Sequence, residues 1–392
     1  MATQTRVVIA TRLFVPEVSA GAFRLNALAS GFIRRSCLVH VVTTTPPDTA
    51  PAGSVDRAGL RLSRFPALRD SGGNVRGYIQ YLSFDIPLVL RLLTTRYDLA
   101  VSEAPPTTGA VVSVISRLKR KPYAYYAADI WTDGLTALGA PRLVIALMRA
   151  FEGHVMRHAA TVLSISDEVT ARILRFGVDQ DRIATVGNGV DTSIFTPDGP
   201  VAESEHPYLI YTGTMSEWQG AEIFVRAMPR VLARFPDARL RFFGQGASEA
   251  ALRRLAAELV PGSVLFGGVV PPQEAARWLR GAAAALVSIV PGLGYDFARP
   301  TKTYAAAACG TAVVFAGLGS GGTLVQANGL GENAEYTLEA VGDAMIRALE
   351  AQASGESARL RQHRVAWTEQ NASLSAVGDA AAAAVLRGGG FA

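Results

Sequence analysis

The regular alternation of short strand-like runs with longer helical patterns constrains the fold of this chain more than any other feature. In the first half, strand-like runs occur at residues 7–10, 39–43, 99–102, 123–127, 162–165 and 183–186. After an interruption the alternation resumes, with runs at residues 208–211, 240–243, 264–266, 285–289 and 312–315. Such alternation indicates βαβ units, in which helices connect parallel strands. We therefore predict an α/β fold with two doubly wound, Rossmann-like domains.

The interruption is the segment TPDGPVAESEHP, residues 196–207, which is rich in proline and acidic residues. Segments of this composition often link domains, and 392 residues exceed the size at which one hydrophobic core usually stops growing. We predict a first domain at residues 1–195, a linker at 196–207 and a second domain at 208–365. Residues 356–386 are alanine-rich and favour helix up to the glycines at 388–390, and we expect residues 366–392 to form a terminal helix.

Composition excludes several classes of protein. The apolar run at residues 86–93 is interrupted by Pro87 and Arg91, well short of a bilayer span, and the N-terminus resembles a first strand rather than a signal peptide. Only two cysteines are present, which fits a reducing compartment, so we expect a cytoplasmic protein. The net charge is +5, but the basic residues are scattered and lack interleaved aromatics, which argues against nucleic acid as a partner.

Glycine turns after the strands are candidate ligand sites, because ligands of doubly wound sheets bind beyond the carboxyl ends of the strands. In the first domain Gly21 opens a helix, although no GxGxxG motif is present. In the second domain the turn YTGTMSEWQG contains Gly213, Thr214 and Gln219. Each of these turns, taken alone, is equally compatible with a purely structural turn.

The segment ARPTKTYAAAACG gives a stronger signal. Pro300 suits a helix start and Thr301 can cap it, while Arg299 and Lys302 add positive charge to the end of the helix that is already positive. Like charge at this end destabilises a helix unless an anion is bound there. We therefore predict an anion site at this helix start, the alternative being a solvated, poorly capped helix.

Two further clusters have a possible chemical role. Asp129 follows a predicted strand end, where it can orient or deprotonate a hydroxyl or simply cap a turn, and Glu103 is a second carboxylate at a strand end. We expect the neighbouring Trp131 to pack. His154 and His158 stand four residues apart, but no glutamate base lies between them and no third ligand is evident, so we predict no metal site.

Three segments carry a resemblance to a known family. Residues 161–198 contain a strand ending in serine, a helix and the turn Asn-Gly-Val-Asp at 188–191. Together with residues 97–133 and the segment PTKTYAAAACGTAVV, they resemble the family 4 glycosyltransferases, in the branch that builds bacterial surface polysaccharides and decorates natural products.

The resemblance implies the GT-B architecture, in which two Rossmann-like domains face each other across a cleft and the last helix returns to the first domain. It implies a metal-independent, retaining sugar transfer from a nucleotide diphosphate without a cofactor, with the donor on the second domain and the acceptor on the first. A UDP-type donor is favoured and a dTDP-type donor is possible. The implied acceptor is a glycan, a lipid-linked sugar or a secondary metabolite, with at most peripheral membrane contact.

Taking the residues and the resemblance together, we predict Asp129 and Lys302 as catalytic residues. We predict the donor contacts at Gly21, Gly213, Thr214, Gln219, Arg299, Thr301 and Lys302. The sequence also departs from the family pattern. Thr214 and Gln219 stand where the family has an arginine and a lysine, and Phe297 and Ala305 stand where it has two glutamates. Our first hypothesis is an active glycosyltransferase, and the alternatives are a non-catalytic relative and a nucleotide-sugar epimerase.

Overall fold

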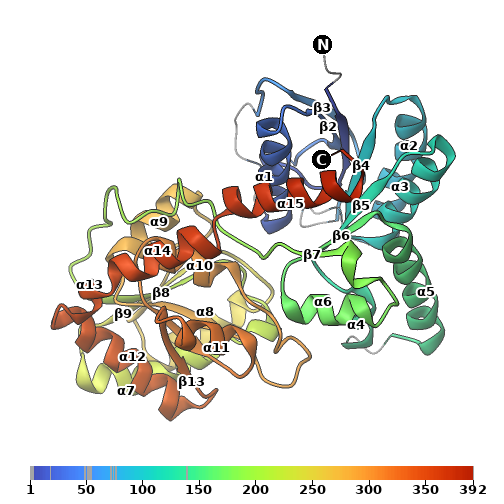
Figure 1. Ribbon diagram of the computed structural model, residues 1–392. Coiled ribbons are helices and arrows are strands. Elements are labelled where there is room, and N and C mark those ends of the chain that lie inside the picture. The colour runs from blue at the N-terminus through green and yellow to red at the C-terminus, as the bar shows by residue number, and fades with distance from the viewer. Residues whose placement is uncertain are drawn as a thin grey trace. The chain divides into compact units, whose positions relative to one another are not determined.

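The computed structural model describes residues 4–17, 19–47, 50, 55–70, 73, 75, 77–137 and 140–391. The chain divides into two compact units, each with its own sheet and helices (Figure 1). One unit is Met1–Asn188 together with Leu374–Ala392, and the other is Gly189–Ser373. Each unit is an α/β domain with a parallel sheet, so the predicted fold class is confirmed.

The first unit contains a seven-stranded sheet of order β3-β2-β1-β4-β5-β6-β7, in which all pairs are parallel. The strands are β1 (Arg6–Ala10), β2 (Leu38–Thr44), β3 (Leu60–Phe65), β4 (Leu99–Glu103), β5 (Tyr123–Ala127), β6 (Thr161–Ser164) and β7 (Ile183–Thr185). The helices are α1 (Ala20–Arg34), α2 (Tyr78–Thr94), α3 (Pro106–Lys119), α4 (Trp131–Ala137), α5 (Arg142–His158), α6 (Asp167–Leu174), the short η1 (Gln180–Arg182) and α15 (Leu374–Gly388).

The second unit contains a six-stranded parallel sheet of order β10-β9-β8-β11-β12-β13. The strands are β8 (Tyr208–Thr212), β9 (Arg239–Phe243), β10 (Val264–Phe266), β11 (Ala285–Ser288), β12 (Val313–Ala316) and β13 (Gly331–Ala334). The helices are η2 (Glu217–Gln219), α7 (Glu222–Arg234), α8 (Glu249–Leu259), α9 (Pro272–Gly281), α10 (Thr301–Ala308), α11 (Ser320–Ala327), α12 (Leu338–Ala353), α13 (Glu356–Arg359) and α14 (Arg361–Asn371).

Burial explains why the central strands were visible in the sequence. Every residue of β4, β5, β11 and β12 is buried, as expected for parallel strands that helices cover on both faces. Such strands appear as continuous apolar runs, and each predicted run overlaps a strand of the structure. Among the helices that the structure describes, none is both long enough and apolar enough to cross a bilayer.

Two strands and the helix breaks near the C-terminus were not predicted. β3 lies at the edge of its sheet and is mostly half-buried, with arginines at Arg61 and Arg64, so its sequence is not apolar. β13 has the sequence GENA, which has low strand propensity. The terminal segment divides into α13, α14 and α15 rather than forming one helix, because the chain breaks at Leu360 and at residues 372–373.

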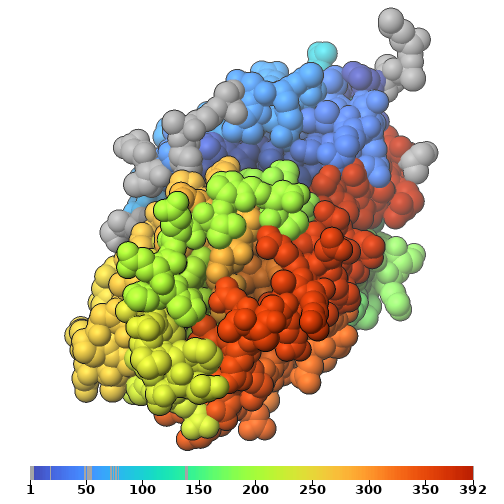
Figure 2. Space-filling model, turned by 90° about the vertical axis from the view of Figure 1, so that its left-hand side faces the viewer, coloured from blue at the N-terminus to red at the C-terminus, as the bar shows by residue number. Residues whose placement is uncertain are grey.

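The segment predicted as a linker, residues 196–207, belongs to the second unit, and the division falls between Asn188 and Gly189. Arg280 of α9 donates to the carbonyl oxygens of Thr196 and Pro200 at 3.1 and 2.9 Å, and Arg361 donates to that of Pro197 at 2.6 Å. Figure 2 shows this part of the chain, in green, at the surface of the unit. These contacts hold the segment on the second unit.

The last helix, α15, packs against α1 within the first unit. Glycines on both helices make the contact close: a Cβ on Gly31 would lie 2.3 Å from the carbonyl oxygen of Gly378, and one on Gly378 would lie 2.3 Å from that of Ala27. The returning segment begins at Leu374 rather than at residue 366.

The close contact of α1 with α15 predicts that Gly31→Ala destabilises the protein, because the added methyl meets backbone atoms that cannot rotate away. Overpacking of this kind costs about 1 to 3 kcal/mol of unfolding free energy. Gly134→Ala in α4 is the matched control, since nothing lies within 4 Å of its added methyl. Urea unfolding measures both, and equal midpoints for the two variants would contradict this packing.

Candidate functional site

The strand order of the second sheet reverses between β8 and β11. In an open α/β sheet, the crevice beyond the carboxyl ends of the strands at this reversal is where ligands bind. Here the turn from Gly213 to Gln219 follows β8, and the segment that leads into α10 follows β11. The structure thus brings together two regions that the sequence identified separately.

Backbone contacts between turns explain the glycines after β8 and β9. Gly213 has a φ of +106° and Gly244 a φ of +131°, and a Cβ on Gly244 would lie 2.0 Å from the carbonyl oxygen of Gly213. The amide of Met215 donates to the carbonyl of Gln245 at 3.0 Å. The turns therefore pack backbone against backbone, and Thr214 is left exposed between them.

Lys302 lies in the first turn of α10, where its ammonium contacts only neutral groups of the described residues. Nζ is 3.7 Å from the centre of the Tyr211 ring and donates to Oε1 of Gln219 at 3.3 Å. A cation over an aromatic face is attracted by the ring quadrupole, but no carboxylate balances it. Burial lowers the pKa of Lys302 well below its ordinary value. The second unit therefore holds a poorly compensated cation at the strand reversal.

Gln219 connects the elements around this cation. Its Oε1 accepts from the Tyr211 hydroxyl at 2.7 Å as well as from Lys302, and its carbonyl oxygen accepts from the Ser288 hydroxyl at 2.5 Å. Gln219 is only 6% exposed. Its side chain thus ties the end of β8 to the start of α10.

The start of α10 differs in one detail from the sequence prediction. Pro300 is the N-cap residue and makes no side-chain capping bond, so Thr301 is the first helical residue rather than the cap. As in any helix N-terminus, the amide N–H groups of Thr301 and Lys302 have no intrahelical acceptor. Such N–H groups can donate hydrogen bonds to an anion. Arg299 precedes them and is half-buried. The predicted residues Arg299, Thr301 and Lys302 therefore lie at the start of one helix.

Some residues near this site were not singled out from the sequence. The hydroxyls of Ser216 and Thr303 are buried without a hydrogen-bond partner in the structure. The rings of Trp218 and Tyr295 stack at 4.8 Å, which joins the turn after β8 to the segment after β11. The run GLGSGG at residues 317–322 follows β12. A strand followed by glycines was the sequence pattern from which this turn could have been recognised as part of the candidate site.

In the first unit, Gly21 lies against a carboxylate rather than against open space. A Cβ on Gly21 would be 3.1 Å from Oε2 of Glu103, and Oε1 of Glu103 accepts from Nε of Arg24 at 3.0 Å. Both side chains of this ion pair are 8% exposed. Burial alone would lower the pKa of Arg24, but the neighbouring Glu103 holds it above its ordinary value. The role of Glu103 that the sequence left open is therefore, at least, to pair with Arg24.

Asp129 follows β5 and is exposed, and the described residues give it no hydrogen-bond partner. The chain immediately after it is fixed by Glu152, which accepts from the amides of Trp131 and Thr132 at 2.8 and 3.0 Å and from the Thr132 hydroxyl at 2.6 Å. Glu152 is fully buried, and burial raises its pKa. A buried carboxylate thus caps α4 and holds the segment that presents Asp129.

The remaining sequence candidates fall outside these sites. The rings of His154 and His158 lie 4.2 Å apart, but the described residues contain no group of three side chains suited to holding a metal. Trp131 makes an edge contact with Tyr81 at 5.5 Å, as expected for packing. Ala305 is 7% exposed within the core, so a glutamate at this position would be buried.

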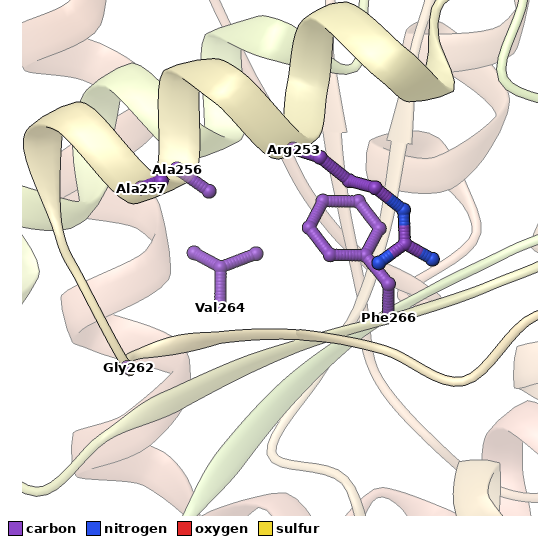
Figure 3. Close-up of a pocket in the computed structure, with 6 residues that line it drawn as sticks. All are labelled: Arg253, Ala256, Ala257, Gly262, Val264 and Phe266. Carbon is purple, nitrogen blue, oxygen red and sulfur yellow. The ribbon is translucent and has the colours of Figure 1, made fainter.

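A separate pocket lies between α8 and β10 (Figure 3). Its lining residues are Arg253, Ala256, Ala257, Gly262, Val264 and Phe266. Arg253 covers the Phe266 ring at 4.5 Å and pairs with Glu249 at 2.8 Å. Because this pocket lies along the edge strand and not at the strand reversal, it is not the candidate site.

Two family profiles match successive parts of the chain. Residues 20–189 match a profile described as glycosyl transferase 4-like domain, and residues 206–351 match glycosyl transferases group 1. The chain belongs to the GT-B glycosyltransferases. The predicted family is therefore confirmed, and each of its two profiles falls largely on one of the two units.

Individual proteins are similar to this chain in sequence or in fold. D-inositol 3-phosphate glycosyltransferase 2 of Catenulispora acidiphila is 29% identical over 192 residues, which cover 44% of each protein. The chain thus spans less than half the length of this curated relative. Among solved structures, sucrose-phosphate synthase of Thermosynechococcus elongatus has a TM-score of 0.73 at 16% identity, covering 96% of both chains. The Anabaena protein HepE, solved with UDP and glucose, has a TM-score of 0.68 at 15% identity, covering 96% of this chain and 97% of its own.

The cap that Glu152 forms in this glycosyltransferase predicts a large effect of Glu152→Ala. The change leaves buried donors without an acceptor, and each unsatisfied group costs about 1 to 3 kcal/mol. Glu222→Ala is the control, because its ion pair with Arg226 is exposed and 4.0 Å long, and such pairs contribute about 0 to 1 kcal/mol. Thermal unfolding measures both variants. Equal losses of stability would show that Glu152 does not hold this segment.

Proposed function

We propose that this chain transfers a sugar from a nucleotide diphosphate sugar to an acceptor hydroxyl, with retention of the anomeric configuration, and that the second unit binds the donor. The observation that carries the proposal is the uncompensated Lys302 ammonium beside the amides of a helix start at the strand reversal. Membership of the GT-B glycosyltransferases supports the reaction class.

The chemistry requires positive charge where the leaving diphosphate accumulates negative charge. Preorganised donors supply this stabilisation without reorganising during the reaction. In our proposal the Lys302 ammonium and the amides of Thr301 and Lys302 contact the diphosphate, and Arg299 adds charge at its edge. Gly213 and Thr214 line the turn opposite. Gln219 then acts by positioning Lys302, since its Oε1 already accepts two hydrogen bonds.

On the first unit, Asp129 is the carboxylate that we assign to the acceptor. It is exposed, whereas Glu103 is buried in an ion pair and Glu152 caps a helix. A carboxylate at this place can orient the acceptor hydroxyl and accept its proton, as can the departing phosphate. Gly21 is assigned the supporting role of letting α1 approach Glu103.

The donor nucleotide is proposed to be uridine diphosphate, with thymidine diphosphate as the second choice. The Anabaena structure holds UDP, and the family pattern places a ribose-binding glutamate where this chain has Ala305. The acceptor class is proposed as a hydroxyl-bearing glycan, lipid-linked sugar or secondary metabolite. The absence of the family's lysine at Gln219 and arginine at Thr214 favours a non-catalytic nucleotide-sugar binder as the second candidate.

A radiolabelled donor assay separates these two candidates. A glycosyltransferase releases nucleoside diphosphate and transfers or hydrolyses the sugar, whereas a non-catalytic binder retains the intact donor. Asp129→Asn should leave donor affinity unchanged and lower turnover by about 100- to 10,000-fold, because it removes the acceptor carboxylate. Asp181→Asn, an exposed carboxylate of the same unit, is the control. Unchanged turnover in Asp129→Asn would remove Asp129 from the mechanism.

The lowered pKa of Lys302 makes UDP binding dependent on pH. A bound diphosphate favours the charged ammonium and therefore raises the pKa of Lys302 in the complex. Below the pKa of the free site, the lysine is charged in both states and affinity is independent of this group. Above it, and up to the pKa in the complex, binding takes up a proton and affinity falls about tenfold per pH unit.

Calorimetry in buffers of different ionisation enthalpy measures that proton uptake. Lys302→Gln should abolish the uptake and weaken UDP binding by roughly 10- to 100-fold, the value of one charge-assisted hydrogen bond. Lys121→Gln, which alters a partly exposed lysine paired with Asp98, is the control. Identical proton uptake in Lys302→Gln and the wild type would place the diphosphate elsewhere.

Ala305 predicts weak selectivity for the ribose. An alanine methyl accepts no hydrogen bond, so the 2′-hydroxyl of UDP gains no charged partner at this position. We expect UDP and 2′-deoxy-UDP to bind within about threefold of each other, whereas a retained charged contact would give at least about tenfold. UMP serves as the control that the assay detects a lost phosphate. A strong preference for UDP would show that another residue holds the ribose.

A further inference from the structure

The first unit exposes an unusual number of large apolar side chains on three helices. Of the 22 large hydrophobic side chains that are exposed among the described residues, ten lie on α2, α3 and α5. On α2 they are Ile79, Leu82, Ile86, Leu90 and Leu93; on α3 they are Val114 and Leu118; on α5 they are Leu143, Leu147 and Phe151. Exposed apolar residues scattered singly need no explanation, but a concentration of this kind marks an interaction surface.

The spacing of these residues shows that they form stripes. On α2 and α5 they recur every three or four positions, which places them on one side of each helix. The opposite side of α2 is occupied separately, because Phe84, Leu88 and Leu92 are fully buried in the core. The helix is therefore apolar on two faces, and only one of them is covered by this unit.

The three helices lie next to one another on the same side of the sheet, with α3 in the middle (Figure 1). Gly109 allows the close contact of α3 with α5, since a Cβ there would lie 2.7 Å from Cγ1 of Val155. The stripes thus combine into one surface, which we call the α2–α3–α5 face.

Charge on this face has a single sign. The only carboxylates on the three helices are Asp85 and Glu152, which are 4% and 0% exposed and accept hydrogen bonds from Thr108 and Thr132. Arg117 and Arg142 on the helices and Arg120 directly after α3 are exposed. Within the described residues these three arginines form no ion pair. The face therefore combines apolar stripes with unpaired arginines and no exposed carboxylate.

We propose that the α2–α3–α5 face binds the surface of an anionic lipid bilayer. Apolar side chains entering the interface and arginines contacting lipid phosphates are the two contributions that hold proteins on such a surface. A second copy of the chain fits less well, because a two-fold contact would bring the same arginines together. This proposal does not depend on the proposed transfer reaction, since no residue of the donor site lies on this face.

Vesicle sedimentation of the full chain tests the proposal. One set of vesicles is phosphatidylcholine alone, and the other contains about 30% phosphatidylglycerol, the probe for anionic headgroups. The wild type should bind the anionic vesicles at least about tenfold more tightly, and added salt should weaken this binding. Equal binding to both sets, or to neither, would overturn the proposal.

Two variants divide the contributions. Ile86→Ser with Leu90→Ser and Leu118→Ser should lower anionic-vesicle binding by at least about tenfold, because the inserted apolar area is lost. Arg117→Gln with Arg120→Gln and Arg142→Gln should remove the preference for anionic lipid.

The matched control is Val269→Ser with Leu318→Ser and Leu338→Ser, three exposed apolar residues of the second unit. Thermal unfolding verifies that all variants fold, as expected for exposed positions. Wild-type affinity in both face variants would overturn the proposal. A second outcome would also overturn the proposal: the wild type binds no vesicles and dimerises with rising concentration in sedimentation velocity, and the serine variant of the face no longer dimerises.

Discussion

The electrostatics of the second unit centre on a lysine that has no carboxylate partner among the described residues. The Lys302 ammonium contacts the Tyr211 ring and the side chain of Gln219. The Ser288 hydroxyl in turn donates to the backbone carbonyl oxygen of Gln219. Burying a cation away from water costs free energy, and this cost is offset only when an opposite charge lies close to the cation. Because the strand order reverses at this point, the fold brings the glycine turn and the start of α10 to the same place. In our proposal an anionic ligand supplies the charge that balances this lysine.

The charges at the strand ends of the first unit are arranged differently. At its own strand reversal, between β1 and β4, the arginine is already paired: Arg24 binds Glu103, and Gly21 lets the helix approach that carboxylate. The free carboxylate, Asp129, lies after β5 and is presented by a segment that the buried Glu152 holds. The two sheets share one strand order, apart from the additional strand β7 of the first, but carry different charges at the strand ends. This difference is the physical basis for assigning the diphosphate to the second unit and an acceptor hydroxyl to the first.

Much of this arrangement was predictable because buried parallel strands have an apolar sequence of their own. The edge strand β3 and the glycine-containing β13 lacked that signal. The contact of Arg280 with residue 200 was not visible in the composition of residues 196–207 either. At the site, Pro300 predicted the helix start, and the charges of Arg299 and Lys302 made it a candidate anion site. The buried contacts of Gln219 and the cap by Glu152 were not predicted, because each joins residues far apart in the sequence. Side-chain pairs of this kind become visible only when the strand order is known.

Hydrogen exchange with and without UDP tests the donor site most directly. The amides of Thr301 and Lys302 precede the first hydrogen-bonded turn of α10, so they should exchange fast in the free protein. The account predicts that UDP slows exchange in peptides covering residues 213–220 and 299–303 and leaves the α8–β10 pocket unchanged. Protection confined to that pocket or to the first unit, or no protection at saturating UDP, would contradict a diphosphate site built around Lys302.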